Sequence, residues 1–219
     1  MSFIDIPAPH GGLEGFLWAV ESPRAAAVVC HPHPQHGGTM HNHVTYRIAR
    51  AFRDQQVAAL RFNFRGVGRS TSTYGEGTGE LEDARSALDF LEKQYAGSPL
   101  FAAGFSFGGR IALQLAAAEP RVVKVLAAGL AVALYDYSFV KQLHKPIAFI
   151  QSEKDQYGAL PEVEALVAQI PPPRELFVVP GSDHLCTGRL KELEELASRA
   201  VRWLLSVDYE SAHGVERQS

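Results

Sequence analysis

The chain has 219 residues, of which 46% are hydrophobic and 21% charged, a balance typical of a folded globular protein. Its formal net charge of -3 gives no electrostatic reason to expect a nucleic acid or an anionic membrane as a partner. Two cysteines, Cys30 and Cys186, are too few for a disulfide framework and are typical of a reducing compartment.

Both ends of the chain are polar or weakly patterned. Residues 1–12 lack a basic segment followed by an apolar one, so no export signal is recognised. The longest apolar run, 125–135, is too short to cross a bilayer. We therefore expect a cytoplasmic protein, monomeric or homodimeric, with a single domain over residues 1–210 and a flexible tail at 211–219.

Short apolar runs alternate with amphipathic segments along the chain. In chain order the pattern predicts strand 3–6, strand 13–19, strand 25–30, helix 42–55, strand 58–62, helix 81–95, strand 100–105, helix 107–118, strand 122–127, strand 146–151, helix 161–169, strand 175–179 and helix 189–206. The later strands are almost entirely apolar, as strands buried on both faces are. This indicates an α/β fold: a mostly parallel central sheet of about eight strands with helices on both faces. Ligands of such sheets bind beyond the carboxyl ends of the strands.

The strand predicted at 100–105 runs into the sequence Gly104-Phe105-Ser106-Phe107-Gly108, and a helix is predicted directly after it. A G-x-S-x-G motif between a strand and a helix is typical of a nucleophile elbow, a sharp turn that lifts the serine hydroxyl above the sheet. The backbone N–H of Phe107 then lies at a helix N-terminus, where it can stabilise a developing oxyanion. The alternative is a glycine-rich turn that only joins strand to helix.

A serine hydroxyl needs a general base, and the base needs an orienting carboxylate. His184 follows the last predicted strand, whereas His213 lies in the tail and His144 precedes a strand, so His184 is the candidate base. Asp155 follows the strand 146–151 and is the candidate acid. Three other carboxylates are weaker candidates for the acid: Asp183, Glu153 and Asp136.

Five histidines lie between His31 and His43. The spacing of His31, His33 and His36 is close to a metal-binding pattern. The chain departs from that pattern at Gln35, where the pattern has an acidic ligand. A metal-dependent hydrolase that uses this cluster is therefore an alternative, although it gives the serine motif no role. The cluster could also bind metal only incidentally.

The chain resembles the α/β-hydrolase superfamily over nearly its whole length. It is most similar to small bacterial serine hydrolases without a lid domain, which are related to dienelactone hydrolases. The stretches that carry the resemblance are "HPHPQHGGTMHN" (31–42), "LRFNFRGVGRS" (60–70), "GEGTGELEDA" (75–84), "GFSFGG" (104–109) and "GSDH" (181–184). Dienelactone hydrolases use a cysteine nucleophile, so the resemblance does not extend to that activity.

The resemblance implies that the loop after Cys30 supplies a second oxyanion amide. Since Pro32 and Pro34 have no N–H, the backbone amide of His33 is the candidate. A serine mechanism of this kind needs no cofactor. Only residues 130–145 are available where larger relatives insert a lid, so we expect no lid or a minimal one. Near these loops, Arg65 either braces a turn against Glu76, Glu80 or Asp83, or contacts substrate.

The candidates for substrate binding are Tyr135, Tyr137 and Leu185. For the two tyrosines, packing in the core is the alternative. Taken together, the residues predict a carboxylesterase-type serine hydrolase that acts on small ester or thioester substrates, mostly with short acyl groups. The metal-dependent hydrolase and a non-catalytic binding protein with the same fold remain as alternatives.

Overall fold

The computed structural model describes residues 2–208, so the tail predicted at 211–219 lies outside the described residues. One eight-stranded sheet runs through the molecule in the order β1-β2-β4-β3-β5-β6-β7-β8. Its strands are β1 (Ser2–Ala8), β2 (Gly11–Trp18), β3 (Ala25–Cys30), β4 (Val57–Phe62), β5 (Leu100–Phe105), β6 (Val122–Ala128), β7 (Ile147–Ser152) and β8 (Arg174–Val179). The antiparallel pairings are those of β2 with β1 and β4, and the others are parallel.

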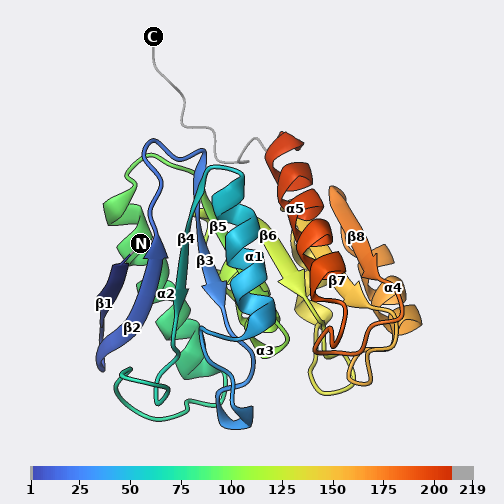
Figure 1. The fold of residues 1–219 in the computed structure, drawn as a ribbon, viewed down its shortest axis with the longest axis horizontal. Coiled ribbons are helices and arrows are strands. Elements are labelled where there is room, and N and C mark those ends of the chain that lie inside the picture. The colour runs from blue at the N-terminus through green and yellow to red at the C-terminus, as the bar shows by residue number, and fades with distance from the viewer. Residues whose placement is uncertain (1, 209–219) are drawn as a thin grey trace.

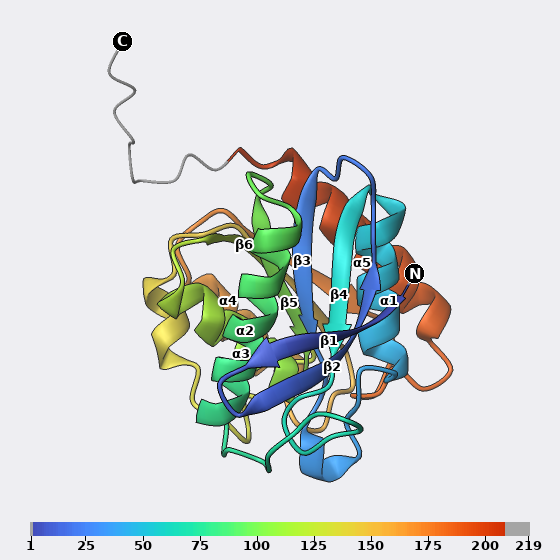
Figure 2. The ribbon, with the colours of Figure 1, turned by 90° about the vertical axis from the view of Figure 1, so that its left-hand side faces the viewer.

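Helices cover both faces of the sheet, as predicted. The helices are α1 (His43–Asp54), α2 (Thr78–Gln94), α3 (Phe107–Ala118), α4 (Leu160–Ala168) and α5 (Leu190–Ser206). Figure 1 shows α1 and α5 in front of the sheet, and the side view in Figure 2 shows α2, α3 and α4 on the opposite face. Every residue of β3, β4, β5 and β7 is buried, because these central strands are covered on both sides. This explains their continuous apolar sequences.

The largest boundary difference between prediction and structure is at α2, which begins three residues before the predicted helix 81–95. The carboxylate of Glu80 accepts hydrogen bonds from the backbone N–H groups of Gly75 and Gly77, at 2.9 and 2.7 Å. These bonds satisfy backbone donors around the first helical turn. The turn is polar, so the spacing of apolar residues gives no sign of it.

The loops that follow the parallel strands gather at one end of the sheet, the lower end in Figure 1. Between β6 and β7 the chain forms only η2 (Ser138–Gln142), a short 3-10 helix. The predicted absence of a lid domain is thus confirmed at this position, and the carboxyl end of the sheet is left open. Within residues 2–208, no helix combines the length and apolar character needed to cross a bilayer.

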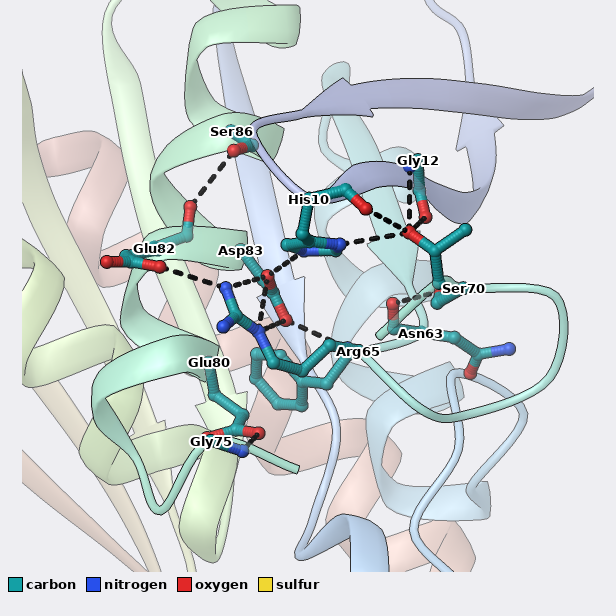
Figure 3. A network of polar contacts seen from close by, with 12 residues as sticks. His10, Gly12, Asn63, Arg65, Ser70, Gly75, Glu80, Glu82, Asp83 and Ser86 are labelled. Atoms are coloured by element: carbon teal, nitrogen blue, oxygen red, sulfur yellow. Dashed lines mark hydrogen bonds and ion pairs between the residues drawn. The ribbon is translucent and has the colours of Figure 1, made fainter. Parts of the chain in front are cut away.

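A buried carboxylate joins the N-terminal hairpin to α2 and the loop before it (Figure 3). Asp83 is fully buried and accepts hydrogen bonds from the Arg65 guanidinium at 2.8 Å and the Arg65 backbone N–H at 2.8 Å. His10 lies in the turn of the hairpin, and its ring is 2.8 Å from Asp83 and 2.9 Å from the hydroxyl of Thr71. Of the two roles predicted for Arg65, the structure shows that it braces its turn against Asp83.

Removing this carboxylate should destabilise the fold. In Asp83→Ala the Arg65 guanidinium, 11% exposed, loses its main anionic partner, so we expect a loss of about 3 kcal/mol in the free energy of unfolding. Glu82 also pairs with Arg65 but is 53% exposed, so Glu82→Ala should cost less than about 1 kcal/mol. Urea unfolding of the two variants provides the measurement, and equal losses would contradict this account.

Candidate active site

Ser106 occupies a sharp turn between β5 and α3. Its backbone has φ 56° and ψ -121°, a conformation that residues with a side chain rarely adopt. A Cβ at Gly104 would lie 2.2 Å from the carbonyl oxygen of Gly108. A Cβ at Gly108 would lie 2.4 Å from the carbonyl oxygens of both Cys30 and His31. The two motif glycines are therefore required by close backbone contacts, and α3 begins directly against the loop after β3.

The structure brings the three predicted polar residues together from three separate loops. The Oγ of Ser106 lies 2.9 Å from Nε2 of His184, and Nδ1 of His184 lies 2.7 Å from Oδ2 of Asp155. His184 and Asp155 are only 5% and 4% exposed. A carboxylate can only accept here, so Nδ1 carries the proton and Nε2 is free to accept from the serine hydroxyl. This arrangement can deprotonate a serine that attacks a carbonyl.

Four hydrogen bonds fix the Asp155 carboxylate. Oδ1 accepts from the backbone N–H groups of Tyr157 and Gly158, at 2.9 and 3.2 Å. Oδ2 accepts from His184 and also from the side-chain amide of Gln151 at 3.0 Å. Gln151 is 1% exposed and also bonds the backbone of Leu130 and Gly158. The sequence interpretation missed Gln151, although a glutamine inside an otherwise apolar buried strand was a usable signal.

The other carboxylates considered as the acid bind elsewhere. Asp183 accepts from a backbone N–H four residues further on, at 2.8 Å. Glu153 accepts from the N–H of Gly181 at 2.5 Å, and Asp136 accepts from the N–H of Ser138 at 2.8 Å. Asp183 and Asp136 are thus bonded within their own loops and Glu153 to the loop after β8, whereas the His184 ring is bonded to Asp155.

Two aromatic rings hold the imidazole of His184. The Phe105 ring lies 5.0 Å away between centroids, tilted by 32°, and the Tyr157 ring meets it edge-on at 4.9 Å. Such packing restricts the rotation of the imidazole and keeps its two nitrogens aimed at their partners. Tyr157 was not predicted, because it is one polar-tipped residue among many in an irregular loop.

The two residues predicted to supply the oxyanion amides, His33 and Phe107, are neighbours in the structure. The His33 and Phe107 rings are 4.9 Å apart between centroids, so the loop after β3 touches the first residue of α3. Among residues 2–208, neither backbone N–H has a hydrogen-bond acceptor. An unpaired N–H at each of these positions is what an oxyanion would need.

Two buried polar side chains hold the far end of the loop that contains His33. The N–H of Met40 donates to the side chain of Asn63 at 2.8 Å, and the guanidinium of Arg61 donates to the carbonyl of Met40 at 2.8 Å. Met40 is fully buried, so these bonds are shielded from water. Both partners lie on or just after β4, which fixes the loop relative to the sheet.

Two residues of the histidine cluster, His31 and His33, use their rings for internal hydrogen bonds. His31 is fully buried; its Nδ1 donates to the carbonyl of Pro32 at 2.6 Å, and its Nε2 accepts from the N–H of Phe64 at 3.0 Å. The ring of His33 contacts the hydroxyl of Tyr74 and accepts from the N–H of Gln35. The four ring nitrogens of these two residues thus have protein partners. No group of three or more potential metal ligands is found within residues 2–208.

A cavity of about 580 Å³ opens above Ser106. Tyr135 and Leu185, both predicted to contact substrate, line it together with Tyr157, Leu134 and Gln156. The predicted Tyr137 does not line this cavity. Its side chain is 4% exposed and packs in the core beside α3, which is the alternative interpretation of that residue.

This fold, with a serine on the strand-to-helix turn bonded to a histidine, defines the class of α/β serine hydrolases. The family described as serine aminopeptidase, S33, matches residues 21–143, more than half of the chain. The chain therefore belongs to this family, which confirms the α/β-hydrolase superfamily that its sequence motifs predicted. Ser106 lies within the matched region.

Similar proteins occur in several bacteria. An uncharacterized protein of Rickettsia prowazekii (strain Madrid E) is 34% identical over 198 residues, which cover 85% of this chain and 83% of the relative. The structure of an α/β serine hydrolase homologue from Coxiella burnetii is 35% identical, with a TM-score of 0.83 over 90% of this chain and 96% of that one. A serine hydrolase without a lid from Xanthomonas campestris is 28% identical, with a TM-score of 0.84 over 95% and 96% of the two chains.

Burial of His31 should make the stability of the fold pH-dependent. Burial lowers the pKa of His31 from 6.5 to about 4, so between these values only the unfolded chain binds the proton. This stabilising contribution is complete above pH 6.5 and is lost as pH falls toward 4. At pH 5 the loss amounts to roughly 2 kcal/mol. Between pH 7.5 and pH 5, the wild type should therefore lose about 2 kcal/mol more of its free energy of unfolding than His31→Gln loses.

His43, an exposed histidine at the start of α1, provides the matched control. His43→Gln should keep the pH dependence of the wild type in the same urea titrations. Identical pH dependence in His31→Gln and the wild type would show that His31 does not cause the loss.

Proposed function

We propose that the protein is a carboxylesterase-type serine hydrolase, which cleaves small ester or thioester substrates through an acyl-enzyme on Ser106. The observation that carries the proposal is the hydrogen-bonded chain from Ser106 through His184 to Asp155, with distances of 2.9 and 2.7 Å. The membership of the chain in a family of serine hydrolases supports it. The free, buried thiols of Cys30 and Cys186 support a reducing, cytoplasmic location.

In the proposed reaction, Oγ of Ser106 attacks the carbonyl carbon while Nε2 of His184 takes the hydroxyl proton. Asp155 holds the imidazole in the correct tautomer and stabilises its protonated form. The protonated His184 then donates to the leaving alcohol or thiol as the bond to the carbonyl carbon breaks. Water, deprotonated by His184, hydrolyses the acyl-enzyme and releases the acid.

The backbone N–H groups of Phe107 and His33 stabilise the oxyanion in this proposal. Pro32 and Pro34 limit the motion of the loop around His33, so its amide needs little reorganisation as negative charge develops. The rings of His33 and Phe107 are in contact, so the two donors come from neighbouring residues, which supports their assignment to one site. The open end of the sheet supports short acyl groups or exposed esters as substrates.

Substitution of the nucleophile tests the proposal. Ser106→Ala should lower kcat/KM for p-nitrophenyl acetate by at least about 10⁴-fold, because no other group takes over the covalent step. Ser22 is exposed and also has a positive φ, 51°, so Ser22→Ala controls for replacing a serine that has a positive φ. Ester hydrolysis at the wild-type rate in Ser106→Ala would refute the proposed mechanism.

Gln151 should act as a positioning residue through Asp155. Gln151→Met keeps the side-chain volume but removes the N–H that shares Oδ2 with His184. Hydrogen bonds to charged groups contribute about 1.5–3 kcal/mol, so we expect kcat/KM to fall about tenfold or more. With more negative charge left on Oδ2, protonated His184 is better stabilised, so the acidic limb of the kcat/KM profile should move to higher pH.

The surface variant Gln142→Met controls for the substitution itself, because Gln142 is exposed on η2. It should leave both the rate and the pH profile unchanged. A lower rate in Gln151→Met with an unshifted pH profile would indicate a purely structural role for Gln151.

A further inference from the structure

The cavity above Ser106 has no charged wall. Its lining includes imidazoles, aromatic rings, aliphatic side chains and amides, but no Asp, Glu, Lys or Arg side chain. A free α-amino group is recognised in proteins by carboxylates, and phosphate groups are recognised by arginine and lysine. The lining therefore offers no ionic partner to the amine of a peptide N-terminus or to the phosphates of a nucleotide-bearing thioester.

Exposed apolar side chains gather at the rim of this cavity. Among the described residues, five large apolar side chains are exposed, and three of them line the cavity: Leu134, Tyr157 and Leu185, at 58%, 41% and 56%. The backbone N–H of Ala133 donates to the carbonyl of Tyr157 at 3.0 Å, which places Leu134 beside Tyr157. Single exposed apolar residues are ordinary, but such a group around a cavity is typical of a binding surface.

The apolar rim lies on the same side of the cavity as the His184 ring. The Tyr157 ring meets the imidazole edge-on at 4.9 Å, and Leu185 follows His184 directly in the chain. The loop of His33 contacts the start of α3 instead. In ester cleavage, the departing alcohol oxygen must face Nε2 of His184, which gives it a proton. The group attached to that oxygen therefore leaves past Tyr157 and Leu185.

We propose that the substrate is an uncharged ester with an apolar alcohol group, which binds against Leu134, Tyr157 and Leu185. The inference rests on the proposed function and adds the chemical class of the leaving group. A bond forms between Oγ of Ser106 and the carbonyl carbon, and the bond from that carbon to the alcohol oxygen breaks. The proton from Ser106 passes through His184 to the alcohol, which is released against the apolar rim.

Two ester series, followed by acid release in a pH-stat, test this proposal. With acetate as the common acyl group, kcat/KM should rise about two- to fourfold for each methylene from methyl to butyl acetate. The butyl-to-methyl ratio should fall about threefold or more in Leu185→Ser and in Leu134→Ser. Phe3 is an equally exposed apolar residue on β1, so Phe3→Ser should keep the wild-type ratio.

The outcomes separate this inference from the function on which it rests. If kcat/KM does not depend on the alcohol, but rises steeply from methyl acetate to methyl hexanoate, the rim holds the acyl chain and the inference is overturned. An unchanged ratio in both leucine variants would also overturn it, while ester hydrolysis itself persists. If no ester is hydrolysed by the wild type, the proposed function and the inference both fail.

A second comparison tests whether the cavity lacks an acidic group that binds a charged amine of the substrate. Alanine butyl ester and its N-acetyl derivative differ in the charge of one nitrogen at neutral pH. We expect the N-acetyl ester to be cleaved with a kcat/KM equal to or above that of the free amine. A tenfold preference for the free amine would reveal a carboxylate partner in the site and would contradict the proposed substrate class.

Discussion

The backbone of Ser106 is held in a conformation that a serine would not adopt by itself, and the site is assembled around that constraint. The neighbouring structure imposes it: the N–H of Ser106 donates to Ala128 of β6 at 2.8 Å, and α3 begins one residue later. Gly104 and Gly108 permit the turn because their missing side chains leave room for other backbone segments. The energy stored in this turn is offset by the packing of β5 and α3 in the core.

The same close packing connects the turn to the loop after β3. Gly108 contacts the carbonyls of Cys30 and His31, so the position of that loop depends on the position of α3. His31 is itself bonded at both ring nitrogens, and Met40 is held by Asn63 and Arg61. The loop that carries the His33 amide is therefore fixed at both ends. Fixed donors are more effective than mobile ones, because they need not reorient when charge develops.

A second set of buried bonds extends behind the histidine. Asp155 accepts from two backbone N–H groups, from His184 and from Gln151, and Gln151 in turn bonds the backbone of Leu130. Buried polar groups are costly unless they are satisfied, and these side chains are satisfied. The position of the imidazole is thus linked to the sheet through β7, rather than depending on the irregular loop that contains it.

Much of the fold and part of the site could be predicted from the sequence. The central strands could be recognised because burial on both faces requires continuous apolar runs, and Ser106 because its turn requires glycines at fixed spacing. His184 and Asp155 follow strands whose carboxyl ends must meet, so topology brings them to the serine. Gln151 could be noticed as a polar residue in an apolar strand, but its role could not be assigned in this way, and neither could the roles of Tyr157 and Leu134. Their roles depend on which atom they face across the fold, and no spacing in the sequence encodes that.

The orientation of single side chains was equally hard to predict. Tyr135 and Tyr137 are two residues apart in one irregular segment, yet the first lines the cavity and the second is buried in the core. A segment without regular periodicity gives no rule for which residue turns inward. The polar first turn of α2 was missed for a related reason, because Glu80 caps the helix with its carboxylate and adds nothing to the apolar stripe.

The central claim is that the hydroxyl of Ser106 becomes covalently acylated during turnover. Rapid acid quenching of the enzyme with excess p-nitrophenyl acetate, followed by mass spectrometry of its peptides, measures this directly. The account predicts one acetyl group on the peptide that contains Ser106 in the wild type, and none on the same peptide in Ser106→Ala. An acetyl group on a histidine or cysteine instead, or turnover with no acyl-enzyme in any variant, would contradict it.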